Sequence, residues 1–169
     1  MVSEVGLGLI GAGAIGKVHV GNLNRNIKGA RLAAVADIDQ NAARSVAGDA
    51  KVYSDFHEMI KDGSVDAVIV CTPPFLTMEI TKVAADAGKD VFCEKPISVT
   101  LEEADKMLAT VKSGGIKFQV GYQRRFDNSY VRARHAMESG ELGRLLLLKE
   151  HNRDPPGPIL GWSTNPAKS

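Results

Sequence analysis

Residues 5–16, Val-Gly-Leu-Gly-Leu-Ile-Gly-Ala-Gly-Ala-Ile-Gly, decide the fold of this chain. A short apolar run, Val5–Ile10, leads directly into a hexapeptide of the form G-x-G-x-x-G, and residues 14–26 can continue as a helix. A strand before the motif and a helix after it are the context that a dinucleotide-binding turn requires. Gly11 permits the tight turn, Gly13 lets the backbone approach a pyrophosphate, and Gly16 lets the helix pack closely on the strand.

An acidic residue stands where such a turn needs one. Asp37 ends the second predicted strand, about 20 residues after Gly16, where a carboxylate accepts hydrogen bonds from both hydroxyls of an adenine ribose. The same carboxylate repels the additional phosphate of NADP, and the next residue is Ile38 rather than a basic side chain. The sequence therefore predicts NAD rather than NADP. The alternatives are an S-adenosylmethionine site, which also uses a glycine-rich first turn, and a turn that binds nothing.

Short apolar runs alternate with helical segments over the first 120 residues. Such alternation predicts an α/β fold, a doubly wound parallel sheet of the Rossmann type with helices on both faces. We expect residues 1–120 to form this NAD-binding domain. The expected strands are 5–10, 31–37, 51–53, 66–71, 90–93 and 116–120, and the expected helices are 14–26, 40–47, one from Ser54 or Asp55, 76–87 and 100–113.

The pattern changes after Gly121. A helix is expected from Asp127 or Asn128 to about Ser139, and residues 144–150, RLLLLKE, are expected to form a strand. One strand and one helix cannot bury their own apolar faces. Residues 121–169 are therefore predicted to be the start of a second, truncated α/β domain for substrate binding and oligomerisation. The unpaired strand edges of this part favour association into a homo-oligomer.

Composition excludes several classes of partner. Lys and Arg number 21 and Asp and Glu 20, so a net charge of +1 gives no footprint for nucleic acid or an anionic membrane. No stretch approaches the roughly 18 apolar residues of a membrane span, and residues 1–6 do not resemble a secretory signal, so none is expected. The two cysteines, Cys71 and Cys93, are expected to be reduced thiols rather than a disulfide or a metal site. The expected location is cytoplasmic.

Two loops add candidates for the site. Cys71-Thr72-Pro73 follows the fourth predicted strand and Glu94-Lys95-Pro96 the fifth, and ligands of open parallel sheets bind at these carboxyl ends. Pro96 biases Lys95 toward an extended backbone, and lysine suits general acid–base chemistry in a desolvated site. A simple proline turn and a surface ion pair between Glu94 and Lys95 are the respective alternatives.

These residues together resemble the glucose–fructose oxidoreductase/inositol dehydrogenase family, Gfo/Idh/MocA. The run AGKDVFCEKP at 87–96 is the most specific element, and GYQRRFD at 121–127 adds to it. A strand leading into HNRDP at 151–155 resembles the inositol dehydrogenase branch in particular. The resemblance implies an NAD-dependent dehydrogenase. Its substrate would be a sugar or polyol such as an inositol, with a hydride transferred between a secondary alcohol and the nicotinamide.

The resemblance also implies roles for single residues. Lys95 would contact the substrate hydroxyl and assist proton transfer as the catalytic residue. Arg125 and Asp154 would face the substrate, with a second-domain ion pair and a loop cap as their alternatives. The implied cofactor contacts are Gly11, Gly13, Ala14, Ile15, Gly16, Asp37, Ile38, Cys71, Thr72, Pro73, Glu94, Lys95 and Gln123.

Two departures from the family pattern stand out. Thr77 occupies a position where many members carry a histidine. The family's second domain also supplies a histidine that acts with the lysine, and neither His19, His57, His135 nor His151 stands in that context. The first three are expected to be structural or solvent-facing. The expectation is the N-terminal portion of a dehydrogenase, and the alternative is a non-catalytic dinucleotide-binding module or remnant.

Overall fold

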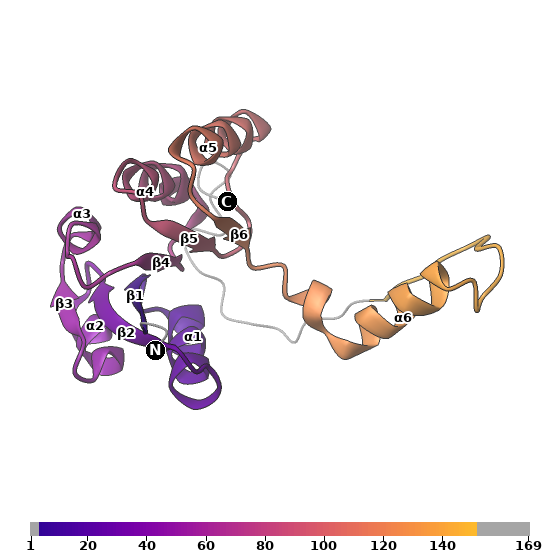
Figure 1. The fold of residues 1–169 in the computed structure, drawn as a ribbon, viewed down its shortest axis with the longest axis horizontal. Helices are drawn as coiled ribbons and strands as arrows, with labels where there is room; N and C mark the ends of the chain where they lie inside the picture. Colours follow the sequence, from indigo (N-terminus) through magenta and orange to yellow (C-terminus); the bar gives the residue numbers. More distant parts are fainter. Residues whose placement is uncertain (1–3, 152–169) are drawn as a thin grey trace.

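The computed structural model describes residues 4–151, and a six-stranded parallel sheet forms its centre (Figure 1). The strand order is β3-β2-β1-β4-β5-β6, so the chain winds outward from β1 in both directions. This confirms the predicted doubly wound Rossmann sheet, in which β1 marks the topological switch point. The strands are β1 (Val5–Ile10), β2 (Ala30–Ala36), β3 (Lys51–Tyr53), β4 (Ala67–Val70), β5 (Asp90–Cys93) and β6 (Phe118–Val120).

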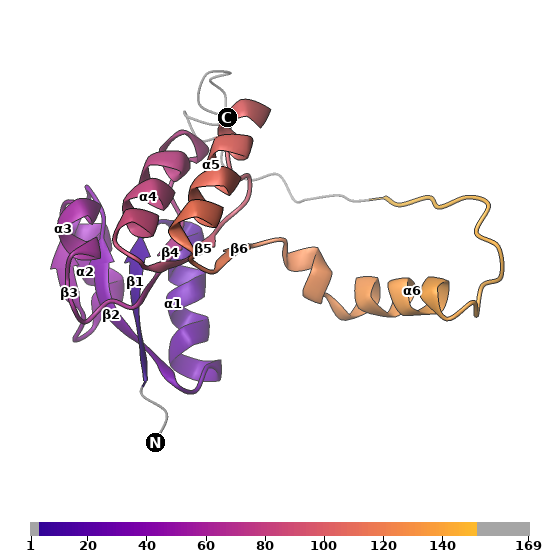
Figure 2. The same cartoon turned by 45° about the horizontal axis from the view of Figure 1, so that its top comes forward.

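Helices connect the strands and cover the sheet on both faces. The first two helices share one apolar cluster with the sheet, and the third and fourth share the other. The fifth packs beside the fourth (Figure 2). These crossover helices are α1 (Ala14–Asn26), α2 (Gln40–Ala47), α3 (Phe56–Ile60), α4 (Pro74–Asp86) and α5 (Leu101–Gly114).

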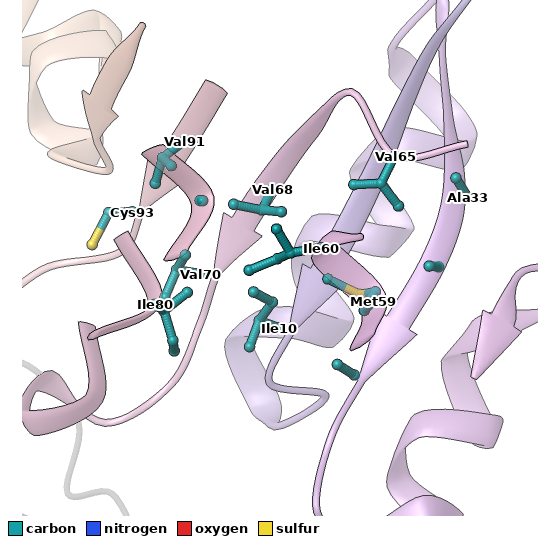
Figure 3. Packing of buried hydrophobic residues seen from close by; sticks show 13 residues of the cluster. Ile10, Ala33, Met59, Ile60, Val65, Val68, Val70, Ile80, Val91 and Cys93 are labelled. Atoms are coloured by element: carbon teal, nitrogen blue, oxygen red, sulfur yellow. The ribbon is translucent and has the colours of Figure 1, made fainter. Parts of the chain in front are cut away.

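The two clusters account for the apolar strand pattern. Leu9 packs into the cluster beneath α1 and α2, whereas its neighbour Ile10 packs into the cluster with Met59 of α3 and Ile80 of α4 (Figure 3). Successive side chains of a strand point to opposite faces, and both faces of this sheet are covered. Central strands must therefore be apolar at every position, which is why β4 reads as an unbroken run.

Local signals set the helix ends. Thr100 Oγ1 accepts the Glu103 N–H at 3.2 Å, which is the first bond of a capping box, whereas Glu103 Oε2 accepts the N–H of Val99, one residue before the cap, at 3.2 Å. Asp55 caps α3 and Asp127 caps α6 (Asn128–Glu138), each through a backbone N–H two residues on. The predicted helix ends agree with these caps to within about two residues, the usual uncertainty of such boundaries.

Residues 122–151 form an arm that leaves the sheet (Figure 2). It contains a short 3₁₀ helix, η1 (Gln123–Phe126), and α6, neither of which has a buried residue. The predicted strand at 144–150 is wrong: these residues carry no strand, and Leu146 is 84% exposed. A strand exists only through hydrogen bonds to a neighbouring strand, and no strand within residues 4–151 pairs with this segment.

Among the described helices, none is both long and apolar enough to cross a membrane.

Candidate functional site

A cleft of about 930 Å³ lies along the carboxyl ends of the strands. Sheet register brings four loops to one level there, because Ile10 pairs with both Ala36 and Val70, and Val70 pairs with Cys93. The residue after each of these strand ends therefore stands at the same rim. Apart from Gly16, the predicted cofactor contacts all line the cleft: Gly11, Gly13, Ala14, Ile15, Asp37, Ile38, Cys71, Thr72, Pro73, Glu94, Lys95 and Gln123.

The glycine turn has three distinct steric environments. Gly11 has φ +97°, and a Cβ there would lie 2.7 Å from the Cys71 carbonyl oxygen. A Cβ on Gly16 would lie 2.2 Å from the Gly11 carbonyl oxygen, so Gly16 supports the turn from behind rather than lining the cleft. A Cβ on Gly13 would meet nothing within 4 Å. Gly13 therefore faces open space at the start of α1.

The start of α1 is suited to an anion. Gly13 is its N-cap and supplies no side-chain hydrogen bond to the first turn, which carries no acidic residue. The first N–H groups of a helix have no partner within the helix, and they carry a partial positive charge. An uncapped glycine turn at this point leaves those groups available to a phosphate.

Asp37 is held firmly at the other side of the turn. Its Oδ2 accepts the Ala12 N–H at 2.6 Å, and its Oδ1 accepts the Asp39 N–H at 2.8 Å. Both bonds orient the carboxylate, and each oxygen keeps a lone pair for a further donor. Ile38 beside it is 95% exposed, which is unusual for a large apolar side chain that lines a cleft.

The loop after β4 contains an unpartnered hydroxyl. Thr72 Oγ1 is buried, and no atom of the described residues forms a hydrogen bond with it. Buried polar atoms normally have a partner, so this oxygen marks a place where a ligand group or water completes the site. Thr77, the position of the family histidine, is 1% exposed in α4 and lies outside the lining of the cleft.

The two thiols do not provide a nucleophile. Cys71 lines the cleft and Cys93 ends β5, and both are free. Burial raises the pKa of each thiol to about 12, with the Glu94 carboxylate adding to the effect. The nucleophilic form of cysteine is the thiolate, so the cleft does not suit thiol chemistry at neutral pH. Within residues 4–151, no group of three or more His, Cys, Asp or Glu side chains is placed to hold a metal ion.

Glu94 pairs with a residue that sequence analysis missed. Its Oε1 lies 2.8 Å from Nε2 of His19, which lines the cleft instead of being merely structural or solvent-facing as expected. The alternative of an ion pair between Glu94 and Lys95 is not formed among the described residues; the Lys95 backbone N–H donates to Glu94 Oε2 at 3.2 Å. Helical spacing puts His19 on the same side of α1 as Ile15, which also lines the cleft, but it gives no signal of the contact with Glu94.

The predicted substrate residues are not gathered at this cleft. Lys95 lines it, and the Lys95–Pro96 peptide bond is cis. Arg125, in η1, instead lines a second hollow of about 630 Å³ between α6 and residues 148–150. Asp154 lies outside the described residues.

A doubly wound sheet with a glycine turn at its switch point and an acid after β2 defines a dinucleotide-binding domain. The chain belongs to the oxidoreductase family with the NAD-binding Rossmann fold, GFO_IDH_MocA, whose profile matches residues 5–122. This confirms the family predicted from the sequence, and the family description confirms NAD as its cofactor.

Inositol dehydrogenases are among the similar proteins. The chain is 37% identical over 159 residues to a myo-inositol 2-dehydrogenase of Thermotoga maritima, covering 92% of this chain and 47% of the relative. It is 35% identical over 161 residues to the NAD⁺-dependent scyllo-inositol 2-dehydrogenase of Bacillus subtilis, covering 94% of this chain and 47% of the relative.

A solved structure of an inositol dehydrogenase also resembles this chain. The scyllo-inositol dehydrogenase of Lactobacillus casei, with bound NAD(H) and scyllo-inositol, superposes with a TM-score of 0.79 at 30% identity. The superposition covers 83% of this chain and 43% of that one. The chain thus spans about half the length of the relatives it matches.

Proposed function

We propose that this chain provides the cofactor-binding half of an NAD-dependent dehydrogenase that acts on a secondary alcohol of an inositol-like polyol or a sugar. The observation that carries the proposal is that the glycine turn, Asp37 and Lys95 line one cleft. The polyol substrate rests on the relatives, which act on inositols. In this proposal residues 1–120 bind the cofactor, and residues 121–169 begin a domain for substrate binding and oligomerisation.

The residues of the cleft fit a dinucleotide. The open space before Gly13 and the uncapped start of α1 suit a diphosphate. Asp37 would hold the adenosine ribose, and the unpartnered Thr72 hydroxyl would serve a polar group of the ligand. The remaining cofactor contacts would come from Ala14, Ile15, Ile38, Cys71, Pro73, Glu94, Lys95 and Gln123, with Gly16 behind the turn. When bound, NAD supplies the nicotinamide carbon that accepts the hydride.

Lys95 would assist the proton transfer of the same reaction. Oxidation of a secondary alcohol removes a hydroxyl proton as the hydride leaves, so a base must stand beside that oxygen. The Lys95 amine, at the rim of the cleft, would hold the hydroxyl and take part in moving its proton. Arg125 and Asp154 would contact the substrate from the second domain.

Asp37 provides the test of the cofactor site. Replacing Asp37 with Ala removes the acceptor for two ribose hydroxyls, and hydrogen bonds to charged groups are worth about 1.5–3 kcal/mol each. We expect the affinity for NAD, measured by titration calorimetry, to fall at least about tenfold, and the weaker affinity for NADP to fall much less. Asp49→Ala removes an exposed carboxylate outside the cleft and is the matched control. Equal losses for NAD and NADP would contradict the assignment.

A binding module without catalysis is the second candidate function. Absorbance at 340 nm with NAD and myo-inositol separates the two candidates. NADH formation that Lys95→Ala abolishes supports the dehydrogenase. Tight NAD binding with no turnover by the chain or by a longer gene product supports the module.

We further propose that the protein works in the cytoplasm as a homo-oligomer without nucleic-acid or membrane partners. The near-zero net charge and the exposed leucines of the arm support this proposal.

A further inference from the structure

We propose that His19 is a positioning residue, which ties the Lys95 loop to helix α1 through Glu94 and so sets one end of the cleft. The inference rests on the proposed dinucleotide site and adds a residue to it. Its basis is a set of contacts that join segments 75 residues apart in the sequence.

Glu94 divides its two oxygens between two partners. Oε1 lies 2.8 Å from His19 Nε2, and Oε2 accepts the backbone N–H of Lys95 at 3.2 Å. An ionised carboxylate has no proton to give, so the histidine nitrogen must be the donor. The histidine therefore fixes the carboxylate, and the carboxylate fixes the backbone from which the lysine side chain projects.

Packing leaves Glu94 little freedom to find another position. Its side chain is 15% exposed and that of His19 is 21% exposed. The His19 ring stands edge-on to Phe92, with centroids 5.3 Å apart. On the other side, a Cβ on Gly121 would lie 2.9 Å from Glu94 Oε1 and 3.1 Å from Phe92 Cζ. The carboxylate thus lies between α1, β5 and the backbone that follows β6, with its remaining side on the cleft.

Loss of the histidine donor would release the loop that carries Lys95. A mostly buried carboxylate depends on its hydrogen-bond donors to offset the cost of its removal from water. When it loses a donor, it moves toward water or another partner. Glu94 already borders the cleft, so without the histidine donor it would turn toward water there and release the Lys95 N–H. Helix α1 would then no longer be joined to the loop after β5.

The adenosine end of the cleft should not respond. Asp37 follows β2 on one side of β1, whereas Glu94 follows β5 on the other side, beyond β4. Asp37 is held by Ala12 and Asp39, and neither of these contacts involves His19. A ligand that reaches only the Asp37 end therefore serves as an internal reference.

The experiment compares NAD with ADP on three variants of the chain. His19→Leu removes the donor at similar size, His19→Gln keeps an amide donor near the position of Nε2, and His57→Leu is the control. His57 pairs with Asp55 at 2.8 Å and does not line the cleft. Affinities come from titration calorimetry. Hydrogen exchange of the Lys95 amide, followed by NMR, reports the Glu94 contact without any ligand.

We expect His19→Leu to weaken NAD binding about tenfold, to leave ADP binding within about twofold, and to speed exchange of the Lys95 amide at least about tenfold. His19→Gln should restore most of both losses, and His57→Leu should change neither. Equal loss of NAD and ADP binding would overturn the proposal, because His19 would then only support the fold. Unchanged Lys95 exchange in His19→Leu, or no rescue by His19→Gln, would overturn it as well.

The proposed function can fail separately. If the unmodified chain binds neither NAD nor ADP, the dinucleotide site is wrong. Exchange of the Lys95 amide still decides whether His19 positions the loop.

Discussion

The segments 66–71 and 144–150 are both strongly apolar, yet only the first forms a strand. Residues 66–71, DAVIVC, contain β4, which lies between β1 and β5 with helices on both faces. Residues 144–150, RLLLLKE, lie beside α6, and the exposed fraction of the four leucines ranges from 49% to 84%. An apolar run indicates only that its side chains favour burial, whereas a strand also needs a neighbouring strand with free backbone N–H and C=O groups. The sheet supplies that neighbour at β4, and the described arm does not.

The largest expected effect comes from comparing buried and exposed side chains of the two regions. Met59 is fully buried between α3 and the sheet, so Met59→Ala should lower the free energy of unfolding by roughly 2–5 kcal/mol. Leu147 is highly exposed in the arm, so Leu147→Ala should change it by less than about 0.5 kcal/mol. Urea denaturation followed by circular dichroism measures both. A comparable loss for Leu147→Ala would show that the arm is packed in solution.

The second comparison concerns two carboxylates and acid. Asp62 accepts hydrogen bonds from Lys51 Nζ and Tyr53 Oη, both at 2.6 Å, and from Ser64. These bonds, led by that from Lys51, hold the pKa of the Asp62 carboxyl well below its usual range. Its contribution to stability is therefore complete above about pH 4 and is lost as the pH falls toward the lowered pKa.

Asp62→Asn should lower the melting temperature at pH 7 by a few degrees and make stability less dependent on pH between about 5 and 2. Glu138→Gln is the matched variant in the arm, where Glu138 pairs with Arg134 at 2.7 Å and both side chains are exposed. Such exposed pairs contribute little, so its melting curve should match that of the unmodified chain. Thermal denaturation across this pH range tests both. An equal acid dependence for Asp62→Asn and the unmodified chain would be evidence against the role of the Asp62 network.

The third comparison uses helix caps. Thr100 caps α5, which packs on α4, and Asp127 caps α6, which has no buried residue. Thr100→Ala should lower the stability of the domain by about 1 kcal/mol, because α5 unfolds together with the sheet. Asp127→Ala should reduce helical circular dichroism slightly while the urea midpoint of the domain stays unchanged. A shifted midpoint for Asp127→Ala would mean that α6 and the sheet unfold as one unit.

The smallest expected effect on stability comes with a change in association. Leu146 in the arm and Leu101 at the start of α5 are both more than four-fifths exposed. Leu146→Lys should reduce the mass measured by light scattering at high protein concentration, because it interrupts a run of four exposed leucines. Leu101→Lys should leave the mass unchanged. The same mass for Leu146→Lys and the unmodified chain would exclude the arm as the association surface.

Most of the site was predictable because its residues stand at the ends of strands, and the sequence pattern locates those ends directly. The turn at Gly11, the acid at Asp37 and the loop of Glu94 and Lys95 all follow predicted strands, and parallel strands bring such residues to one edge. His19 was not predictable in the same way. It lies on a helix, and only the fold shows that its ring contacts Phe92 of β5 and that its Nε2 meets Glu94.

The sequence by itself determined the order of strands and helices, the doubly wound sheet and the glycine turn, because periodicity, caps and glycine positions act over short distances. The tertiary structure alone decided that His19 joins Glu94 and that Arg125 lines a different hollow from Lys95. It also decided that residues 144–150 form no strand. Each of these outcomes depends on a partner distant in the chain, or on the lack of one among the described residues, and a local pattern carries no information about such partners.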